Sequence, residues 1–198
     1  MFSLNVPLPP AIDRLAGDLH PKLTGFDRVR ERHTLVCKRF GVENVRRGER
    51  DGGDERGEGE GGEERGGDRP VPPRQEALDR LRERLRRPLA PADPFEVAVT
   101  GSDVFDAPRS GSRPIVYLTV ESDGLVRLHR RLCAAFGTVE GIEGDAYVPH
   151  VTLARGGDPE PGAVADLVET EFDPVRWRVH ALDAWDPEYR EVAATVDL

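Results

Sequence analysis

The chain has 198 residues, of which 37 are acidic and 28 are lysine or arginine, so its formal net charge is −9. This length accommodates one compact unit or two small lobes, with a sizeable core. The net negative charge excludes a general electrostatic attraction to nucleic acid, and any contact with RNA therefore has to be local.

The first part of the chain predicts a strand, a helix and a second strand. Residues 2–6 have the composition of a strand, which Pro9 and Pro10 end. A helix over residues 11–19 follows, because its apolar residues recur at helical spacing. Residues 32–38 (RHTLVCK) are short and rich in aliphatic residues, and a glycine, Gly41, follows them. They predict the second strand.

Residues 43–73 consist mainly of Gly, Glu, Asp and Arg and contain almost no apolar residue. Such a segment cannot offset its ordering entropy by burial, so we predict a disordered insertion within a single domain spanning residues 1–198. Acidic residues outnumber arginines between Glu43 and Arg69. This balance favours a solvated spacer over an RNA-binding tail.

Order is expected to resume with a helix over residues 74–87, which carries an apolar stripe and ends at Pro88. Its arginines indicate either a salt-bridged surface or a phosphate-binding patch. Residues 95–104 and 115–120 predict two strands that can pair as a hairpin. Ser122 can cap the next helix, which Gly137 ends and in which His129 falls on the polar side, so we expect this histidine at the surface.

The remaining elements are a strand from His150, a helix over residues 162–170, and strands over 175–182 and 191–196. In the 175–182 strand, Arg176, Arg178 and His180 share one face, which indicates either a basic cleft wall or a solvated edge strand. This mixed order of helices and short strands predicts an α+β fold.

Residues 147–155 (YVPHVTLAR) carry the clearest chemical signal. Alternation along a strand points Val151 and Leu153 into a core, whereas His150 and Thr152 point the other way, about 6–7 Å apart. An imidazole can transfer protons, and a neighbouring hydroxyl can donate to a phosphoryl oxygen. The pattern therefore favours chemistry on a phosphate group.

A second histidine and threonine lie in residues 32–38, but Thr34 directly follows His33, so a regular strand points them to opposite faces. In one register, His33, Leu35 and Cys37 face the cleft. In the other, Thr34, Val36 and Lys38 do. Counting back from Gly41 supports the second register, anchoring on the histidine supports the first, and a bulge would bring both side chains inward. We favour His33 in the cleft.

Two such strands resemble the 2H phosphoesterase superfamily, which is named for paired His-x-Thr motifs. Within it the chain is similar to the archaeal and bacterial 2′-5′ RNA ligases, also called RNA 2′,3′-cyclic phosphodiesterases. The segments that carry the resemblance are residues 1–7 (MFSLNVP), 32–35 (RHTL), 113–120 (RPIVYLTV) and 149–155 (PHVTLAR). The resemblance implies a bilobal α+β domain with two antiparallel sheets, related by a pseudo-twofold axis, and flanking helices around a central cleft. The first motif departs from the family pattern, and no internal sequence repeat shows the two lobes independently.

The resemblance implies a metal-independent reaction in which His33 and His150 exchange protons on opposite sides of a 2′,3′-cyclic phosphate. Thr152 and Thr34 would donate to its free oxygens. The candidate substrate-binding residues are two cations and an aromatic residue, Lys38, Arg155 and Tyr117. Strict alternation points Arg155 away from His150, so it would act from the end of the strand. Trp177 and Trp185 are further stacking candidates, although core packing is the commoner fate of such residues.

Attack by water gives a 2′-phosphate, and attack by the 5′-hydroxyl of another RNA gives a 2′-5′ linkage. The alternative is a degenerate module that binds a nucleotide or RNA end without turnover. A metallohydrolase is disfavoured, because the histidines lack carboxylate or cysteine partners at ligand spacing. We thus expect no metal and no cofactor, and as partners RNA ends or small cyclic-phosphate nucleotides.

Composition also bears on the setting. Lys22 and Lys38 are the only lysines, and an acidic, arginine-rich chain is typical of halophiles, whose salt screens protein–RNA repulsion. A GC-rich genome with an acidic linker explains the same composition. Cys37 and Cys133 are expected to be buried free thiols. With no targeting segment and no apolar run of about 18 residues, we expect a soluble, cytoplasmic monomer without membrane contact.

Overall fold

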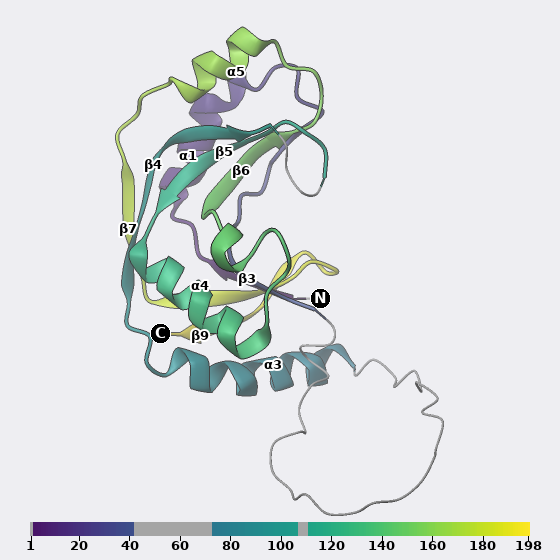
Figure 1. The fold of residues 1–198 in the computed structure, drawn as a ribbon, viewed down its shortest axis with the longest axis vertical. Coiled ribbons are helices and arrows are strands. Elements are labelled where there is room, and N and C mark those ends of the chain that lie inside the picture. The colour runs from purple at the N-terminus through teal and green to yellow at the C-terminus, as the bar shows by residue number, and fades with distance from the viewer. Residues whose placement is uncertain (1, 42–72, 107–110) are drawn as a thin grey trace, which may run out of the picture.

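The computed structural model describes residues 2–41, 73–106 and 111–198 (Figure 1). The helices are α1 (Pro10–Leu19), α3 (Arg74–Leu89), α4 (Asp123–Phe136) and α5 (Pro161–Val168), with short 3-10 turns η1 (His20–Lys22) and η2 (Gly144–Ala146). The strands are β1 (Phe2–Val6), β2 (Arg28–Val29), β3 (Leu35–Phe40), β4 (Phe95–Phe105), β5 (Ile115–Glu121), β6 (His150–Arg155), β7 (Val175–Val179), β8 (Ala181–Asp186) and β9 (Glu191–Asp197). The predicted insertion over residues 43–73 lies outside the described residues, apart from Pro73.

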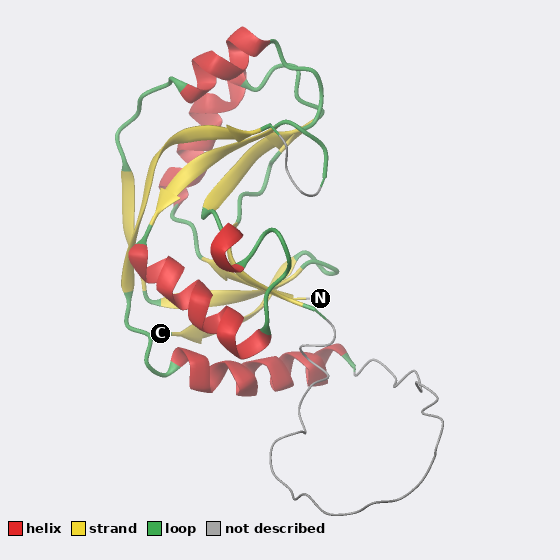
Figure 2. Ribbon diagram, in the orientation of Figure 1, coloured by secondary structure: helices red, strands yellow, loops and turns green. Residues whose placement is uncertain are grey.

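The strands form one antiparallel sheet in the order β7-β4-β5-β6-β3-β1-β8-β9, with β2 added beside β6. Its two central strands pair only at Leu35 and Val151. The two predicted sheets are therefore the two halves of one curved sheet. In Figure 2, α3 and α4 lie together next to the half of the sheet that contains β3, and α5 lies next to the half that contains β4. The α+β prediction is confirmed.

The two halves repeat one another in strand pairing. Each half contains a strand, a helix and a strand in which the two strands are antiparallel neighbours, β1-α1-β3 in one and β5-α4-β6 in the other. In both pairs the register shifts at the same place. Cys37 is the extra residue between two pairs of the first half, and Leu153 is the extra residue in the second. The predicted pseudo-twofold relation is thus present in the backbone.

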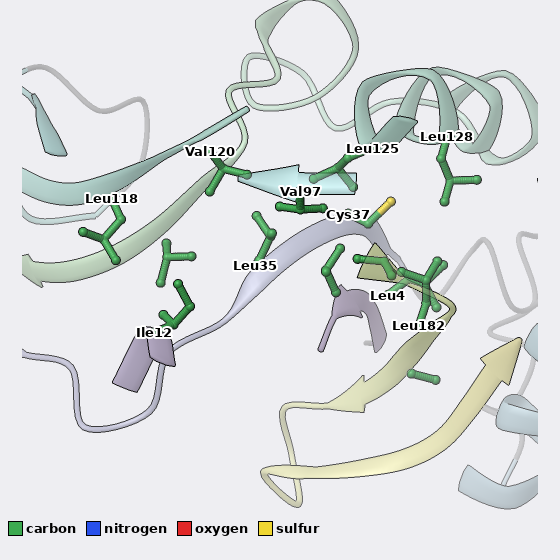
Figure 3. Close-up of a cluster of buried hydrophobic side chains, with 14 of the residues drawn as sticks. Leu4, Ile12, Leu35, Cys37, Val97, Leu118, Val120, Leu125, Leu128 and Leu182 are labelled. Carbon is green, nitrogen blue, oxygen red and sulfur yellow. The ribbon is translucent and has the colours of Figure 1, made fainter. Parts of the chain in front are cut away.

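A single core connects the halves. Figure 3 shows buried side chains from both halves, among them Leu4 and Leu35 of one half and Leu118 and Val120 of the other. The predicted apolar stripe of α4 is buried, and the Ser122 hydroxyl caps this helix by accepting a hydrogen bond from the Leu125 amide at 3.1 Å. One face of each strand packs against the apolar stripe of a helix, and the opposite face is therefore left to line a cleft.

The prediction for His129 was wrong, because this side chain is completely buried. Its face of α4 is covered by β3 and by the loop before β6. The ring donates from Nδ1 to the Cys37 carbonyl at 2.7 Å, accepts the Gly144 amide at Nε2 at 2.9 Å, and stacks on Tyr147. Both cysteines are buried free thiols, as predicted.

Several element predictions change in detail. The strand predicted over residues 32–38 is β3, so His33 and Thr34 precede it. Helix α3 runs on to Leu89, one residue beyond Pro88, and its surface carries ion pairs such as Arg86 with Glu83 at 2.9 Å. The predicted 175–182 strand is divided at His180 into β7 and β8, which lie at different places in the sheet.

Candidate functional site

A cavity of about 690 Å³ is lined by residues from both halves of the sheet, around the ends of β3 and β6. Its volume suits a small ligand such as a nucleotide. We call it the central cleft. Its lining includes His150, Thr152, Arg155, Phe105, Thr34, Val36, Arg39, Trp185, Arg30, Arg32, Arg190 and the loop residues Gly141, Ile142 and Tyr147.

His150 is fixed in one orientation at the start of β6. Its Nδ1 donates to the Val148 carbonyl at 2.7 Å, so the neutral ring keeps its lone pair on Nε2, which has no hydrogen-bond partner among the described residues. Phe105 and Tyr117 pack edge-on against the ring, each with a centroid distance of 5.3 Å. Burial, and then the positive charges of Arg39 and Arg155, lower the pKa of His150. The imidazole is therefore a neutral base.

Thr152 lies two residues further along β6 and also lines the central cleft, as alternation predicts. Arg155 does so as well, although strict alternation pointed it to the other face. The extra residue Leu153 explains the difference, because Leu153 and Ala154 are both buried and the alternation is reset after them. Arg155 is thus brought to the same side as His150.

Strand β3 repeats this pattern with other residues. Thr34 and Val36 line the central cleft, the next two residues are buried, and Arg39 lines the cleft again. By register, Val36 lies opposite Asn5 as Thr152 lies opposite Tyr117. The two halves therefore place Thr34 where the other half has His150, Val36 where it has Thr152, and Arg39 where it has Arg155.

His33 faces a different cavity, so the register that we favoured is not the one in the structure. This second cavity, of about 510 Å³, is lined by α1 and the end of β1. The side chain of His33 is 8% exposed, and its Nδ1 donates to the Asp13 carboxylate at 3.1 Å. Thr34 lines both cavities. His33 thus lines the second cavity, whereas His150 lines the central cleft.

Lys38, predicted as a cation for the phosphate, is buried in the protein interior. Its Nζ donates to the Glu143 carboxylate at 2.5 Å and to the Arg39 carbonyl at 2.7 Å. The bulge at Cys37 turns Lys38 inward, and the cation that reaches the central cleft is its neighbour, Arg39. The other oxygen of Glu143 accepts the Arg39 amide at 2.9 Å, which fixes the backbone of that arginine.

Tyr117, the predicted aromatic contact, lies behind the cleft wall. It is 4% exposed, donates from its hydroxyl to Asp103 at 3.1 Å, and stacks on Phe105 with a centroid distance of 4.1 Å. Burial and the Asp103 carboxylate raise the pKa of Tyr117 to about 12. Phe105 presents the aromatic surface instead, and Trp185 takes the corresponding position beside β1.

Sequence reasoning missed the arginines other than Arg155. Arg30, Arg32, Arg39 and Arg190 also line the central cleft. Arg32 lies over the Trp185 ring at 4.7 Å and donates to the Arg190 carbonyl at 2.7 Å. Arginines at every second position from 28 to 32 were visible in the sequence, and this alternation could have indicated a basic strand face.

The central cleft offers one neutral imidazole, two threonine hydroxyls and several guanidinium groups. Guanidinium and hydroxyl groups bind phosphate oxygens by charge-assisted and neutral hydrogen bonds. Across the described ranges, no group of three or more His, Cys, Asp or Glu side chains is arranged to hold a metal ion. In the same ranges we find no helix with the length and apolar composition needed to cross a membrane.

Comparison with known proteins gives a family and solved structures of similar fold. The family model for the 2′-5′ RNA ligase superfamily matches residues 69–189, which include the His150 strand but not residues 33–36. The crystal structure of TT0787 of Thermus thermophilus is similar over 100% of this chain and 97% of that chain, with a TM-score of 0.58 and 20% sequence identity. No curated protein matches the sequence. With a model match over more than half of its length, the chain belongs to the 2′-5′ RNA ligase superfamily.

Proposed function

We propose that the central cleft binds the phosphate at an RNA end or in a nucleotide and holds only one of the two proton-transfer groups of a two-histidine phosphoesterase. The observation that carries this proposal is Thr34, which stands where the other half of the fold has His150. Opening a cyclic phosphate needs a base on one side and an acid on the other. A threonine hydroxyl donates a hydrogen bond, but it is too weak an acid and too weak a base to serve as the second proton-transfer group near neutral pH.

The binding part of the proposal is supported by the paired cations. Arg39 and Arg155 occupy equivalent positions in the two halves and both act on the charge state of His150. A phosphate beside His150 would lie between them and would accept hydrogen bonds from Thr34 and Thr152. Neither arginine forms an ion pair with a carboxylate among the described residues, so both are available to an anion.

Binding of adenosine 2′,3′-cyclic phosphate, measured by titration calorimetry, tests this proposal. Arg39→Ala and Arg155→Ala are each expected to weaken binding about tenfold or more, since each removes a charged hydrogen bond. Arg176→Ala is the matched control, because Arg176 is exposed on β7 and does not line the cleft. Unchanged affinity in both cleft variants would contradict the proposal.

Slow opening of a 2′,3′-cyclic phosphate is a second candidate function, favoured by the orientation of His150. With Nδ1 bonded to Val148, the free Nε2 can take a proton from an attacking hydroxyl group. Water as nucleophile gives the 2′-phosphate, and a 5′-hydroxyl gives a 2′-5′ linkage. Turnover in EDTA that His150→Ala abolishes would support this function. Turnover that survives this substitution would contradict it.

A further inference from the structure

Four arginines, Arg28, Arg30, Arg39 and Arg155, form what we call the arginine cluster. Strand β2 exists only as a short addition to β6, in which Arg28 lies opposite Arg155 and Val29 opposite Ala154. The Arg30 amide continues this pairing by donating to the Leu153 carbonyl at 2.8 Å. Paired and alternate residues share a face, so Arg28 and Arg30 lie on the side of Arg155, while Val29 packs against the core.

The positive charges of this cluster have no acidic partners within the described part of the chain. No ion pair there includes any of the four arginines. The Nε of Arg155 is buried without a hydrogen-bond partner, and burial, together with the charges of Arg30, Arg28 and Arg39, lowers the pKa of Arg155. In a protein with a net charge of −9, such a local concentration of like charge indicates an anionic ligand.

One phosphate at His150 does not account for all four residues. The positive charges that act on His150 are those of Arg39 and Arg155, whereas Arg28 and Arg30 act on Arg155. Arg28 lies opposite Arg155, at the end of β6 away from His150. The opposite side of the cleft, next to Arg39, is lined by Gly141 and Ile142 instead. Arg32 also lines the cleft, but it lies over the Trp185 ring and donates to the Arg190 carbonyl, so Arg28 and Arg30 are the cations that extend the site beside Arg155.

We propose that Arg28 and Arg30 bind a second phosphate, the next one along an RNA strand whose terminal phosphate lies at His150. This inference rests on the proposed function and specifies its ligand as an RNA end rather than a nucleotide with a single phosphate. Arg155 lies between the two phosphate positions and contacts both. The exposed side chains of Arg28 and Arg30 leave the site open to a continuing chain.

Titration calorimetry in EDTA, at one fixed salt concentration, with three ligands tests this. The ligands are adenosine 2′,3′-cyclic phosphate, the same nucleotide with an added 5′-phosphate, and the dinucleotide ApA ending in a 2′,3′-cyclic phosphate. The second and third ligands are expected to bind about tenfold more tightly than the first. The double variant Arg28→Ala/Arg30→Ala should lose this gain, so that the three ligands bind to it with equal affinity. Arg176→Ala should retain the gain.

Equal affinity of wild type for all three ligands would overturn the inference, as would a gain that survives the double variant. A gain for the dinucleotide alone would still support it and would assign the second phosphate to an oligonucleotide rather than to a nucleotide bisphosphate. A failure of the proposed function is different, because in that case the first ligand would not respond to Arg39→Ala or Arg155→Ala.

Discussion

His150 combines a fixed tautomer with a lowered pKa, and the lowered pKa sets how a reaction that uses this imidazole as its base should depend on pH. The base form is the neutral ring, and an unperturbed histidine gains its proton near pH 6.5. Because burial and two arginines hold the pKa of His150 below that value, the neutral form persists as the pH falls through 6.5.

Ring opening that depends on His150 should therefore keep its rate from pH 7.5 to about 6.5 and decline only at lower pH. A rate profile, or the chemical shift of the His150 ring followed by NMR, measures this directly. A decline centred above pH 6.5 would mean that the negative charge of a bound phosphate, or another group, controls the protonation of His150.

At the level of single residues, the sequence predicted the His150 side of the site and mispredicted the other. Alternation sufficed for His150 and Thr152 because both precede the extra residue Leu153. It failed for Lys38 because the bulge at Cys37 exchanges the faces of the residues that follow. A bulge of this kind depends on pairing with a partner strand, and no local pattern in residues 32–38 reveals it.

At the level of elements, the ion pair of Lys38 and Glu143 ties β3 to the loop before β6. Both side chains are 1% exposed, and Glu143 also accepts the amides of Arg39 and Val139. Removing one partner of such a pair leaves a buried charge without compensation.

Glu143→Gln is thus expected to lower the free energy of unfolding by about 3–5 kcal/mol, as measured by urea denaturation. Adding Lys38→Met to this variant should recover part of the loss, since no unpaired charge then remains. A single variant as stable as wild type would show that the pair is not needed to hold the loop. Glu96→Gln is the matched control, because the Glu96–Arg178 pair at 3.6 Å is exposed.

The order and type of the elements were largely predictable, because amphipathic stripes and alternation are local properties of the sequence. The apolar stripes of α3 and α4 and the β4–β5 hairpin are examples. The burial of His129 on α4 was not predictable, because the loop that covers this side chain packs there only in the folded chain. The repeat between the two halves was not predictable either, because the halves share their strand pairing and register but not their residue types.

At the level of the whole molecule, the sequence separates a folded domain from the charged segment over residues 43–73. The core formed by the described residues joins both halves of the sheet.

Replacing residues 43–72 by a short Gly/Ser linker should therefore leave the circular dichroism spectrum and the cooperative thermal transition intact. The linker changes only the loop-closure entropy, by amounts of about 1 kcal/mol. Loss of a cooperative transition in the shortened chain would show that the segment contributes to the fold. The same variant should also bind adenosine 2′,3′-cyclic phosphate like wild type.

Thr34 stands where the other half of the fold has His150, and introducing a histidine there tests whether a second proton-transfer group is missing. The double variant Thr34→His/Val36→Thr gives the β3 half the residues that the β6 half has at His150 and Thr152. We predict that it opens a 2′,3′-cyclic phosphate RNA end in EDTA about 10²-fold faster than wild type or more, because it gains a second proton-transfer group. His33→Ala should leave the wild-type rate unchanged. A folded double variant that binds the ligand without any gain in rate, or a wild-type rate that His33→Ala abolishes, would show that Thr34 does not occupy the place of the second proton-transfer group.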